Sequence, residues 1–275
     1  MKNLNTTAKN TWCPGCFNFH LLAAVKNVAN AQLNKSGKDD LALVTGIGCH
    51  AKLFDYVNLN GINTLHGRVL PMCLGIKVGN PNLKVIGVSG DGDAYAEGME
   101  HLIHAARFNC DIKYIVQNNQ VFALTVGQPT PTSRRGFKDK TTPEGIAFEP
   151  INPLKIMLAS GASFVARVYA DSKQIEWVLN EAFKHKGFAF IEILSPCLVF
   201  NNSREMKEKI YMLDEKHNKE SFDEAMKKAG EFDYNEVKKI PMGIFYRKER
   251  EVFEDKFKQL VALKEKNISW KEVKR

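Results

Sequence analysis

The sequence VIGVSGDG at residues 85–92 decides which fold this chain is expected to adopt. Its apolar first half predicts a buried strand, and the Gly-Asp-Gly triplet is a polar turn at the carboxyl end of that strand. A second apolar run, residues 112–117, ends in the same way in the pair Asn118-Asn119. A helix over residues 97–109 returns the chain to the same sheet edge, so the segment predicts a βαβ unit.

The two turns carry the groups that a magnesium-bound diphosphate needs. Asp91 offers a carboxylate and Asn119 a carbonyl, both hard oxygen ligands suited to Mg²⁺. The glycines let backbone N–H groups approach phosphate oxygens. Open α/β sheets bind ligands at the carboxyl ends of their strands, so a diphosphate–magnesium site is predicted there. The alternative is that both turns only connect a helix to its strands.

The order and spacing of the Gly-Asp-Gly and Asn-Asn motifs resemble the thiamine diphosphate (TPP) motif of TPP-dependent enzymes. This resemblance implies a TPP-binding fold of the diphosphate-binding type. The sequence predicts an α/β class, with a parallel sheet, helices on both faces and a helical C-terminal extension. Strands are expected at 41–45, 85–89, 112–117, 163–168 and 188–194, and helices at 17–31, 70–78, 97–109, 154–160 and 172–186.

Two units are expected along the chain. Residues 1–200 form the TPP- and magnesium-binding domain, and residues 201–275 form a charged, helix-rich C-terminal arm with an apolar island at 240–246. We expect this arm to pack on a partner or on another protomer. The loop 120–150 is too long for a passive connection and is interpreted as a lid or an interface.

Composition is that of a globular enzyme. The 275 residues are 44% hydrophobic and 25% charged, which are ordinary values. No apolar run is long enough for a membrane span, and residues 1–10 lack the apolar core of a signal peptide, so a cytoplasmic protein without a membrane partner is expected. The net charge is +8, but no basic run alternates with aromatic residues, so no nucleic-acid partner is expected.

The six cysteines are the second strong signal. Cys13 and Cys16 form a CxxC motif before a predicted helix, Cys49 lies in a glycine-rich turn, and Cys197 follows a predicted strand. The remaining two, at 73 and 110, lie in apolar context and are interpreted as core residues.

Three interpretations of a four-cysteine site are open. A CxxC at a helix start suits a thioredoxin-like redox pair. Four thiolates suit structural zinc, although zinc usually takes two close pairs. A [4Fe–4S] cluster accepts ligands from distant loops. A TPP site in the same chain favours the cluster, because the electron-rich carbanion left by decarboxylation of a 2-oxoacid needs a one-electron carrier nearby.

These motifs together resemble the β subunit of 2-oxoacid:ferredoxin oxidoreductases. The matching stretches follow the family order and are TWCPGC at 11–16, GIGC at 46–49, LHGR at 65–68, GIKVGNP at 75–81, GDGD at 90–93, LTVGQ at 124–128, PT at 131–132, SPC at 195–197 and IPMGIFY at 240–246.

The resemblance implies a role for each matching position. The [4Fe–4S] ligands are Cys13, Cys16, Cys49 and Cys197. The Mg²⁺ ligands are Asp91, Asn119 and the backbone carbonyl of Val121. The residues lining TPP are Ile47, Gly48, Cys49, His66, Gly90, Asp91, Gly92, Asp93, Asn119, Val121, Leu124 and Thr125. None of the departures from the family pattern, such as Phe17, His50 and Ala123, falls on a metal ligand.

Two further residues are candidates for catalysis. His66 falls where the resemblance implies a histidine that contacts the cofactor, and the alternative is a core histidine bonded to backbone. Lys52 lies about one helical turn after Cys49, where an ammonium could pair with the C1 carboxylate of the substrate. The alternative for Lys52 is a lysine that faces solvent.

The chain offers no recognisable glutamate for the aminopyrimidine of TPP, and in the family this half of the site lies on the α subunit. The resemblance therefore implies an enzyme that needs an α subunit. It implies oxidation of a 2-oxoacid to an acyl-CoA, with electrons passing from TPP through the cluster to ferredoxin or a similar acceptor. Residues 90–94 and 101–107 resemble members that act on 2-oxoglutarate, which is favoured, with pyruvate next.

Two other functions are open at this point. The chain could be a subunit of a non-redox TPP-dependent decarboxylase or lyase with a structural zinc Cys₄ site. It could also be a zinc-stabilised scaffold that is not an enzyme.

Overall fold

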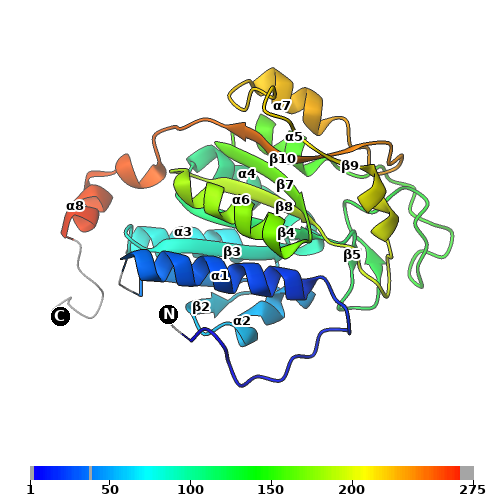
Figure 1. The fold of residues 1–275 in the computed structure, drawn as a ribbon, viewed down its shortest axis with the longest axis horizontal. Helices are drawn as coiled ribbons and strands as arrows, with labels where there is room; N and C mark the ends of the chain where they lie inside the picture. Colours follow the sequence, from blue (N-terminus) through cyan, green and yellow to red (C-terminus); the bar gives the residue numbers. More distant parts are fainter. Residues whose placement is uncertain (1–2, 37–38, 267–275) are drawn as a thin grey trace.

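The computed structural model describes residues 3–36 and 39–266, and one large sheet organises them (Figure 1). Its strand order is β2-β1-β3-β4-β8-β7-β10-β9. The bounds are Leu41–Thr45 (β1), Asn60–Asn63 (β2), Lys84–Gly90 (β3), Ile112–Asn118 (β4), Phe164–Tyr169 (β7), Ala189–Leu194 (β8), Ile210–Met212 (β9) and Ile240–Arg247 (β10). The six strands from β2 to β7 are parallel, and β10 pairs antiparallel with β7.

The central strands are apolar because both faces of the sheet are covered. Every residue of β1, β4, β7 and β8 is buried, as expected for parallel strands between two helical layers. The five strands predicted from the sequence are confirmed, with bounds that differ by no more than one residue. The α/β fold class is confirmed with them.

Helices cover the two faces separately. On one face, α1 (Asn18–Ser36) packs beside α6 (Ser172–Lys184) (Figure 1). On the other lie α3 (Val69–Gly79), α4 (Met99–Phe108) and α5 (Pro153–Ala159), with α7 (Phe222–Ala229) packed against α5. Two further α-helices among the described residues are α2 (Leu53–Tyr56) and α8 (Lys258–Lys266).

Helix ends follow local chemistry more than apolar periodicity. Asp171 accepts hydrogen bonds from the N–H groups of Lys173 and Gln174 and so caps α6. The prediction was wrong at the start of α4, which begins at Met99 and not at residue 97. Residues 92–96 form one wide turn in which the Glu97 N–H bonds the Gly92 carbonyl at 3.2 Å, and a regular helix begins only after it.

The C-terminal extension contains strands as well as the expected helices. Its apolar island forms β10, which covers the edge of β7 and continues the main sheet, and β9 pairs with β10. Six successive buried residues from Ile240 to Phe245 explain the strand, because a surface helix would expose some of them. The expected arm extends to residue 275, and its part from 267 lies outside the described residues.

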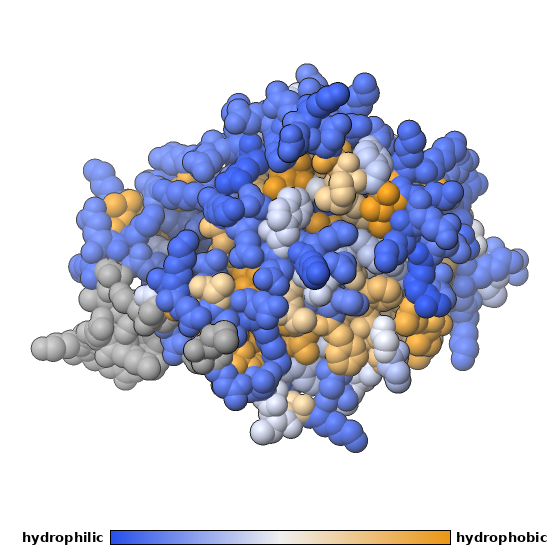
Figure 2. Space-filling view, in the orientation of Figure 1, coloured by the Kyte–Doolittle hydropathy of each residue, from blue (hydrophilic) through white to orange (hydrophobic). Residues whose placement is uncertain are grey.

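The carboxyl ends of the parallel strands lie at one edge of the sheet, on the right of Figure 1. The loop after β4 carries a small hairpin there, β5 (Val121–Phe122) with β6 (Gln128–Pro129). Figure 2 shows hydrophobic side chains gathered on the lower right of the same view, over the start of α1. Among the described residues, no helix is long and apolar enough to cross a membrane.

Candidate functional site

A cavity at the carboxyl edge of the sheet brings together every residue predicted to contact the cofactor. Its volume is about 90 Å³. It is lined by Ile47, Gly48, Cys49, His66, Gly90, Asp91, Gly92, Asp93, Asn119, Val121, Leu124 and Thr125, together with Asn18, His50, Gln117, Phe122 and Ala123. Small-molecule pockets usually enclose ~300–1,000 Å³, so this chain forms only one wall of a site for a cofactor-sized ligand.

Asp91 is held in place by hydroxyl groups. Its carboxylate is buried, and Oδ2 lies 2.5 Å from Thr130 Oγ1 and 3.1 Å from Thr132 Oγ1. Oδ1 receives only a long bond of 3.4 Å from the Asn119 N–H, so it is the freer oxygen for a cation. Burial raises the pKa of Asp91 to about 6, although the hydrogen bonds from the two hydroxyl groups lower it.

Asn119 lies next to Asp91 in a tight turn. Its Oδ1 accepts the Val121 N–H at 3.0 Å, which turns the side-chain oxygen back along its own loop. The Asn201 side chain donates to the Asn119 carbonyl at 3.0 Å and ties this loop to the segment after Cys197. Gln120, which lies between Asn119 and Val121, has a positive φ of 62°. The predicted magnesium ligands therefore come from two neighbouring loops.

Close packing explains two glycines of the site. A Cβ at Gly92 would lie 2.1 Å from the Phe122 ring, and one at Gly46 would lie 1.9 Å from Asp93 Oδ2. A side chain at either position would displace a residue that lines the cavity.

Asp93 is a second buried carboxylate in the cavity wall. Its Oδ1 accepts the Gly67 N–H at 2.7 Å and lies 3.3 Å from His66 Nδ1. His50 lies 3.5 Å from Oδ2 through Nε2, but this nitrogen accepts the Gly90 N–H at 3.1 Å. A nitrogen that accepts a hydrogen bond carries no proton, so we treat the His50–Asp93 contact as packing and not as an ion pair.

Several buried polar atoms at this cavity have no hydrogen-bond partner in the described chain. They are Asn18 Nδ2, His66 Nδ1, Asp93 Oδ2 and Gln117 Oε1. Buried polar groups are normally satisfied, and an unpaired one costs free energy. The nitrogens of Asn18 and His66 suit an acceptor such as a phosphate oxygen, whereas the oxygens of Asp93 and Gln117 suit an N–H group of a ligand.

The four predicted cluster ligands lie near one another. Burial raises the pKa of Cys49 to about 11, and the charges of Cys16, Cys197 and Cys13 raise it further. The pKa of Cys16 is raised by its burial and by Cys13 and Cys197. Cys49 also lines the cofactor cavity, so the cysteine group adjoins it.

None of the described cysteines is in a disulfide. Over residues 3–36 and 39–266, no three His, Cys, Asp or Glu side chains converge as ligands of a single metal ion. The remaining two cysteines, Cys73 and Cys110, are buried in the core as predicted.

The two candidate catalytic residues are placed differently. His66 lines the cavity, with its ring centroid 6.0 Å from that of Phe122. Lys52 does not line the cavity, and its ammonium donates to Thr11 Oγ1 at 2.5 Å. The Lys52 charge lowers the pKa of Cys49, which places it on the cysteine side of the site.

Sequence reasoning missed several residues of the site. Thr130 and Thr132 both donate hydrogen bonds to Asp91. Thr130 lies outside the matching motifs, and Thr132 lies in one of them but was given no role. Asn18 and Gln117 were missed as cavity residues. The available signal was position, because Asn18 follows the CxxC motif and Gln117 directly precedes the asparagine pair.

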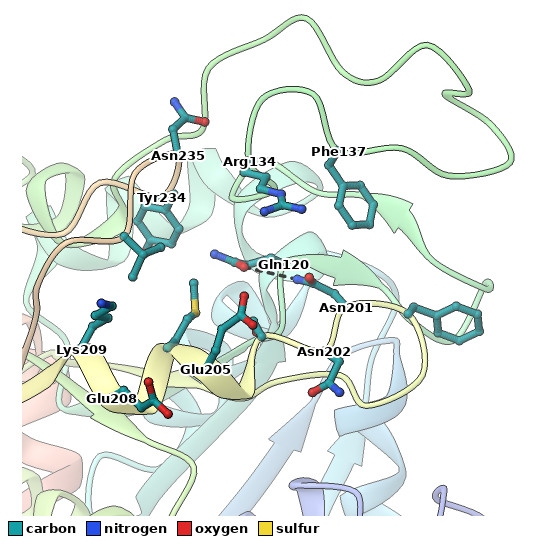
Figure 3. Close-up of a pocket in the computed structure, with 14 residues that line it drawn as sticks. Gln120, Arg134, Phe137, Asn201, Asn202, Glu205, Glu208, Lys209, Tyr234 and Asn235 are labelled. Atoms are coloured by element: carbon teal, nitrogen blue, oxygen red, sulfur yellow. Dashed lines mark hydrogen bonds between the residues drawn. The ribbon is translucent and has the colours of Figure 1, made fainter.

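A second and larger cavity, of about 560 Å³, lies between the segment 200–209 and the loop at 134–137 (Figure 3). Gln120 and Tyr234 form part of its wall. None of the residues predicted to bind the cofactor lines it, so we do not assign the cofactor to this cavity.

Two protein families match successive parts of the chain. Residues 46–193 match the family described as "Thiamine pyrophosphate enzyme, C-terminal TPP binding domain". Residues 197–262 match the family that describes the C-terminal part of the pyruvate ferredoxin oxidoreductase beta subunit. The chain therefore contains a TPP-binding domain of the first family.

Individual proteins similar to this chain are subunits of 2-oxoacid:ferredoxin oxidoreductases and related enzymes. The chain is 41% identical over 256 residues to the 2-oxoacid:ferredoxin oxidoreductase subunit beta of Saccharolobus solfataricus, covering 87% of this chain and 82% of that one. It is 34% identical to the 2-oxoglutarate synthase subunit KorB of Archaeoglobus fulgidus, covering 90% and 89%. A structure of 2-oxoglutarate:ferredoxin oxidoreductase from Magnetococcus marinus, with 2-oxoglutarate, coenzyme A and succinyl-CoA bound, aligns with a TM-score of 0.86 at 31% identity over 96% and 89% of the chains.

The chain belongs to the β subunits of 2-oxoacid:ferredoxin oxidoreductases. This confirms the resemblance inferred from the motifs. The protein is accordingly an oxidoreductase subunit that requires an α subunit.

Proposed function

We propose that this β subunit, joined to its α subunit, oxidises 2-oxoglutarate to an acyl-CoA and passes the electrons through a [4Fe–4S] cluster to ferredoxin. Pyruvate is the next candidate substrate. The observation that carries the proposal is the position of Cys49, which lines the cofactor cavity and lies beside the other three cysteines. The choice of 2-oxoglutarate is supported by the names of the similar KorB protein and of the aligned structure.

The residues of the cavity fit a magnesium-bound TPP diphosphate. Asp91, Asn119 and the Val121 carbonyl are the proposed Mg²⁺ ligands, because their loops are adjacent and Asp91 keeps Oδ1 nearly free. Asn18, Asp93 and Gln117 offer unpaired polar atoms to the cofactor. TPP held by these residues would supply a carbon nucleophile and an electron sink for the decarboxylation of a 2-oxoacid.

The cysteine group fits an iron–sulfur cluster. Cys13, Cys16, Cys49 and Cys197 come from three separate segments and give one thiolate for each of four irons. A cluster held by these four thiolates would supply a one-electron acceptor.

His66 and Lys52 have separate proposed roles. His66 faces the cavity from the Asp93 side, where it can donate a hydrogen bond to a polar group of the cofactor or substrate. For Lys52, contact with the substrate carboxylate stays a prediction, and it requires the side chain to leave the Thr11 hydroxyl. Residues 1–200 are proposed as the cofactor domain, and 201–275 as the extension that adjoins a partner.

The cysteine assignment is tested with the co-expressed αβ complex, purified without oxygen. We expect broad visible absorbance and iron bound to the β subunit. Cys16→Ser lowers the iron content, whereas Cys110→Ser, a core cysteine, leaves it unchanged. Zinc in place of iron in the wild-type complex, or equal iron in both variants, would contradict the assignment and favour the non-redox alternative.

A further inference from the structure

A fully buried ion pair lies in the sheet behind the candidate magnesium site. Arg167 on β7 and Glu192 on β8 are both 0% exposed, and Arg167 Nε donates to Glu192 Oε2 at 2.7 Å. Removing two charges from water costs several kcal/mol, and well-packed apolar residues are often as stable in such places. The sheet itself therefore gives no reason for a carboxylate at this position.

The Glu192 carboxylate is saturated with donors. Besides Arg167, it accepts the Tyr95 hydroxyl at 3.2 Å and the Tyr234 hydroxyl at 3.0 and 3.1 Å. It also accepts Asn118 Nδ2 at 2.9 Å. Because a carboxylate only accepts, it forces the Asn118 amide to present Nδ2 to the sheet and Oδ1 to the loops at the sheet edge.

Asn118 Oδ1 binds both loops that carry the candidate magnesium ligands. It accepts the Gln120 N–H at 3.1 Å, which fixes the turn containing Asn119. It lies 2.9 Å from Thr132 Oγ1, and the same hydroxyl lies 3.1 Å from Asp91 Oδ2. The single Thr132 hydroxyl proton is shared between Asn118 Oδ1 and Asp91 Oδ2, so a continuous set of buried polar contacts runs from Glu192 to both Asp91 and Asn119.

We propose that Glu192 is a positioning residue for the metal–diphosphate site, acting through Asn118 and Thr132. The inference rests on the proposed magnesium site and adds residues outside the cavity to it. Tyr234 extends the set to the C-terminal segment, and its ring forms part of the wall of the larger cavity (Figure 3). The C-terminal segment thus contributes to holding a metal site that it does not touch.

The test measures Mn²⁺ binding, with Mn²⁺ as a spectroscopic substitute for Mg²⁺. The αβ complex is titrated with Mn²⁺ in the presence of TPP, and free Mn²⁺ is followed by electron paramagnetic resonance. Glu192→Gln keeps the size of the side chain but places an N–H₂ group against donors. We expect at least ~10-fold weaker Mn²⁺ binding, the range found when supports of metal ligands are removed.

Two more variants keep the test decisive if Glu192→Gln fails to fold. Tyr234→Phe removes one donor from the set and is expected to weaken Mn²⁺ binding several-fold. Tyr211→Phe is the matched control, because its hydroxyl bonds Glu231 in the same C-terminal segment and is not connected to Glu192. The control is expected to bind Mn²⁺ like the wild type.

A merely structural role would lower the melting temperature of Glu192→Gln and leave the Mn²⁺ affinity of the folded complex unchanged. That result, or equal weakening in Tyr211→Phe, would overturn the inference. If Glu192→Gln does not fold, unchanged affinity in Tyr234→Phe overturns it. A wild-type complex that fails to bind Mn²⁺ with TPP would instead contradict the proposed magnesium site.

Discussion

Single side chains decide the chemistry of this site. Asp91 is the clearest case, because its charge is buried with few hydrogen-bond donors around it. Its carboxylate is buried, and the described residues compensate it with two threonine hydroxyls and one long backbone N–H contact. Burial consequently raises its pKa to about 6. A bound cation would remove this penalty, because it favours the charged form.

We predict that Asp91→Asn stabilises the cofactor-free protein and abolishes TPP binding. The folded pKa lies above that of the unfolded chain, so the carboxylate costs stability as pH rises from about 4 to 6, and this cost remains above pH 6. At pH 7.5 the gain is up to about 3 kcal/mol. Thermal unfolding of the cofactor-free protein measures the stability. Titration of the αβ complex with TPP measures the binding.

The exposed Asp55→Asn is the control and is expected to change neither quantity. A variant of Asp91 that binds TPP like the wild type would contradict the magnesium assignment.

The residues that could be predicted from the sequence are those that sit directly in motifs. Asp91 and Asn119 follow apolar strands, so their meeting at one sheet edge could be inferred from strand order alone. Thr130 could not, because a long loop brings its hydroxyl to Asp91 and no periodicity fixes the path of that loop. Glu192 is likewise hidden, because it interrupts an apolar strand without any motif around it.

At the scale of elements, the apolar strands were predictable and the additions to the sheet were not. The five predicted strands are mainly apolar runs, which can be recognised in the sequence. β2, by contrast, consists of exposed residues and joins the sheet only through its pairing with β1. β10 was visible as an apolar island, but its place beside β7 depends on a tertiary contact.

The end of helix α6 carries a pH-sensitive contact. His185 caps the helix, is buried, and lies 2.8 Å from Ser163 Oγ through Nε2. Burial lowers its pKa to about 4, and the charges of Lys113 and Arg247 act in the same direction. The folded protein therefore keeps His185 neutral at pH values where the unfolded chain is protonated.

We predict that this histidine contributes to unfolding at low pH. Because its folded pKa lies below the unfolded value, stability is fully present above about pH 6.5 and is lost as pH falls toward 4, by up to about 3 kcal/mol. His185→Asn removes the titrating group, so its loss of stability between pH 7 and pH 5 should be smaller than that of the wild type. Urea unfolding at the two pH values measures the free energy of unfolding of both proteins. Identical losses in the wild type and the variant would contradict the role of His185.

At the scale of the molecule, the chain presents an incomplete site. The cavity of about 90 Å³ is open at the carboxyl edge of the sheet, and it is too small to enclose a cofactor. Exposed hydrophobic side chains lie on the loops around it, among them Leu65, Leu124 and Val126. An exposed apolar surface beside a half-formed pocket is the feature expected where a second protein chain completes the site.

We therefore predict that both TPP binding and turnover depend on the α subunit. The isolated β subunit should bind TPP weakly and convert no 2-oxoacid, because the group that activates the aminopyrimidine is absent from its cavity wall. Adding the α subunit should restore both properties.

The most direct test of the account is the reduction of ferredoxin by the anaerobically purified αβ complex, measured with and without 2-oxoglutarate and CoA. We predict reduction that requires both compounds and both subunits, and that is lost in Asp91→Ala and in Cys16→Ser but retained in Cys110→Ser. Full activity from the β subunit alone, or full activity in Cys16→Ser, would contradict the account.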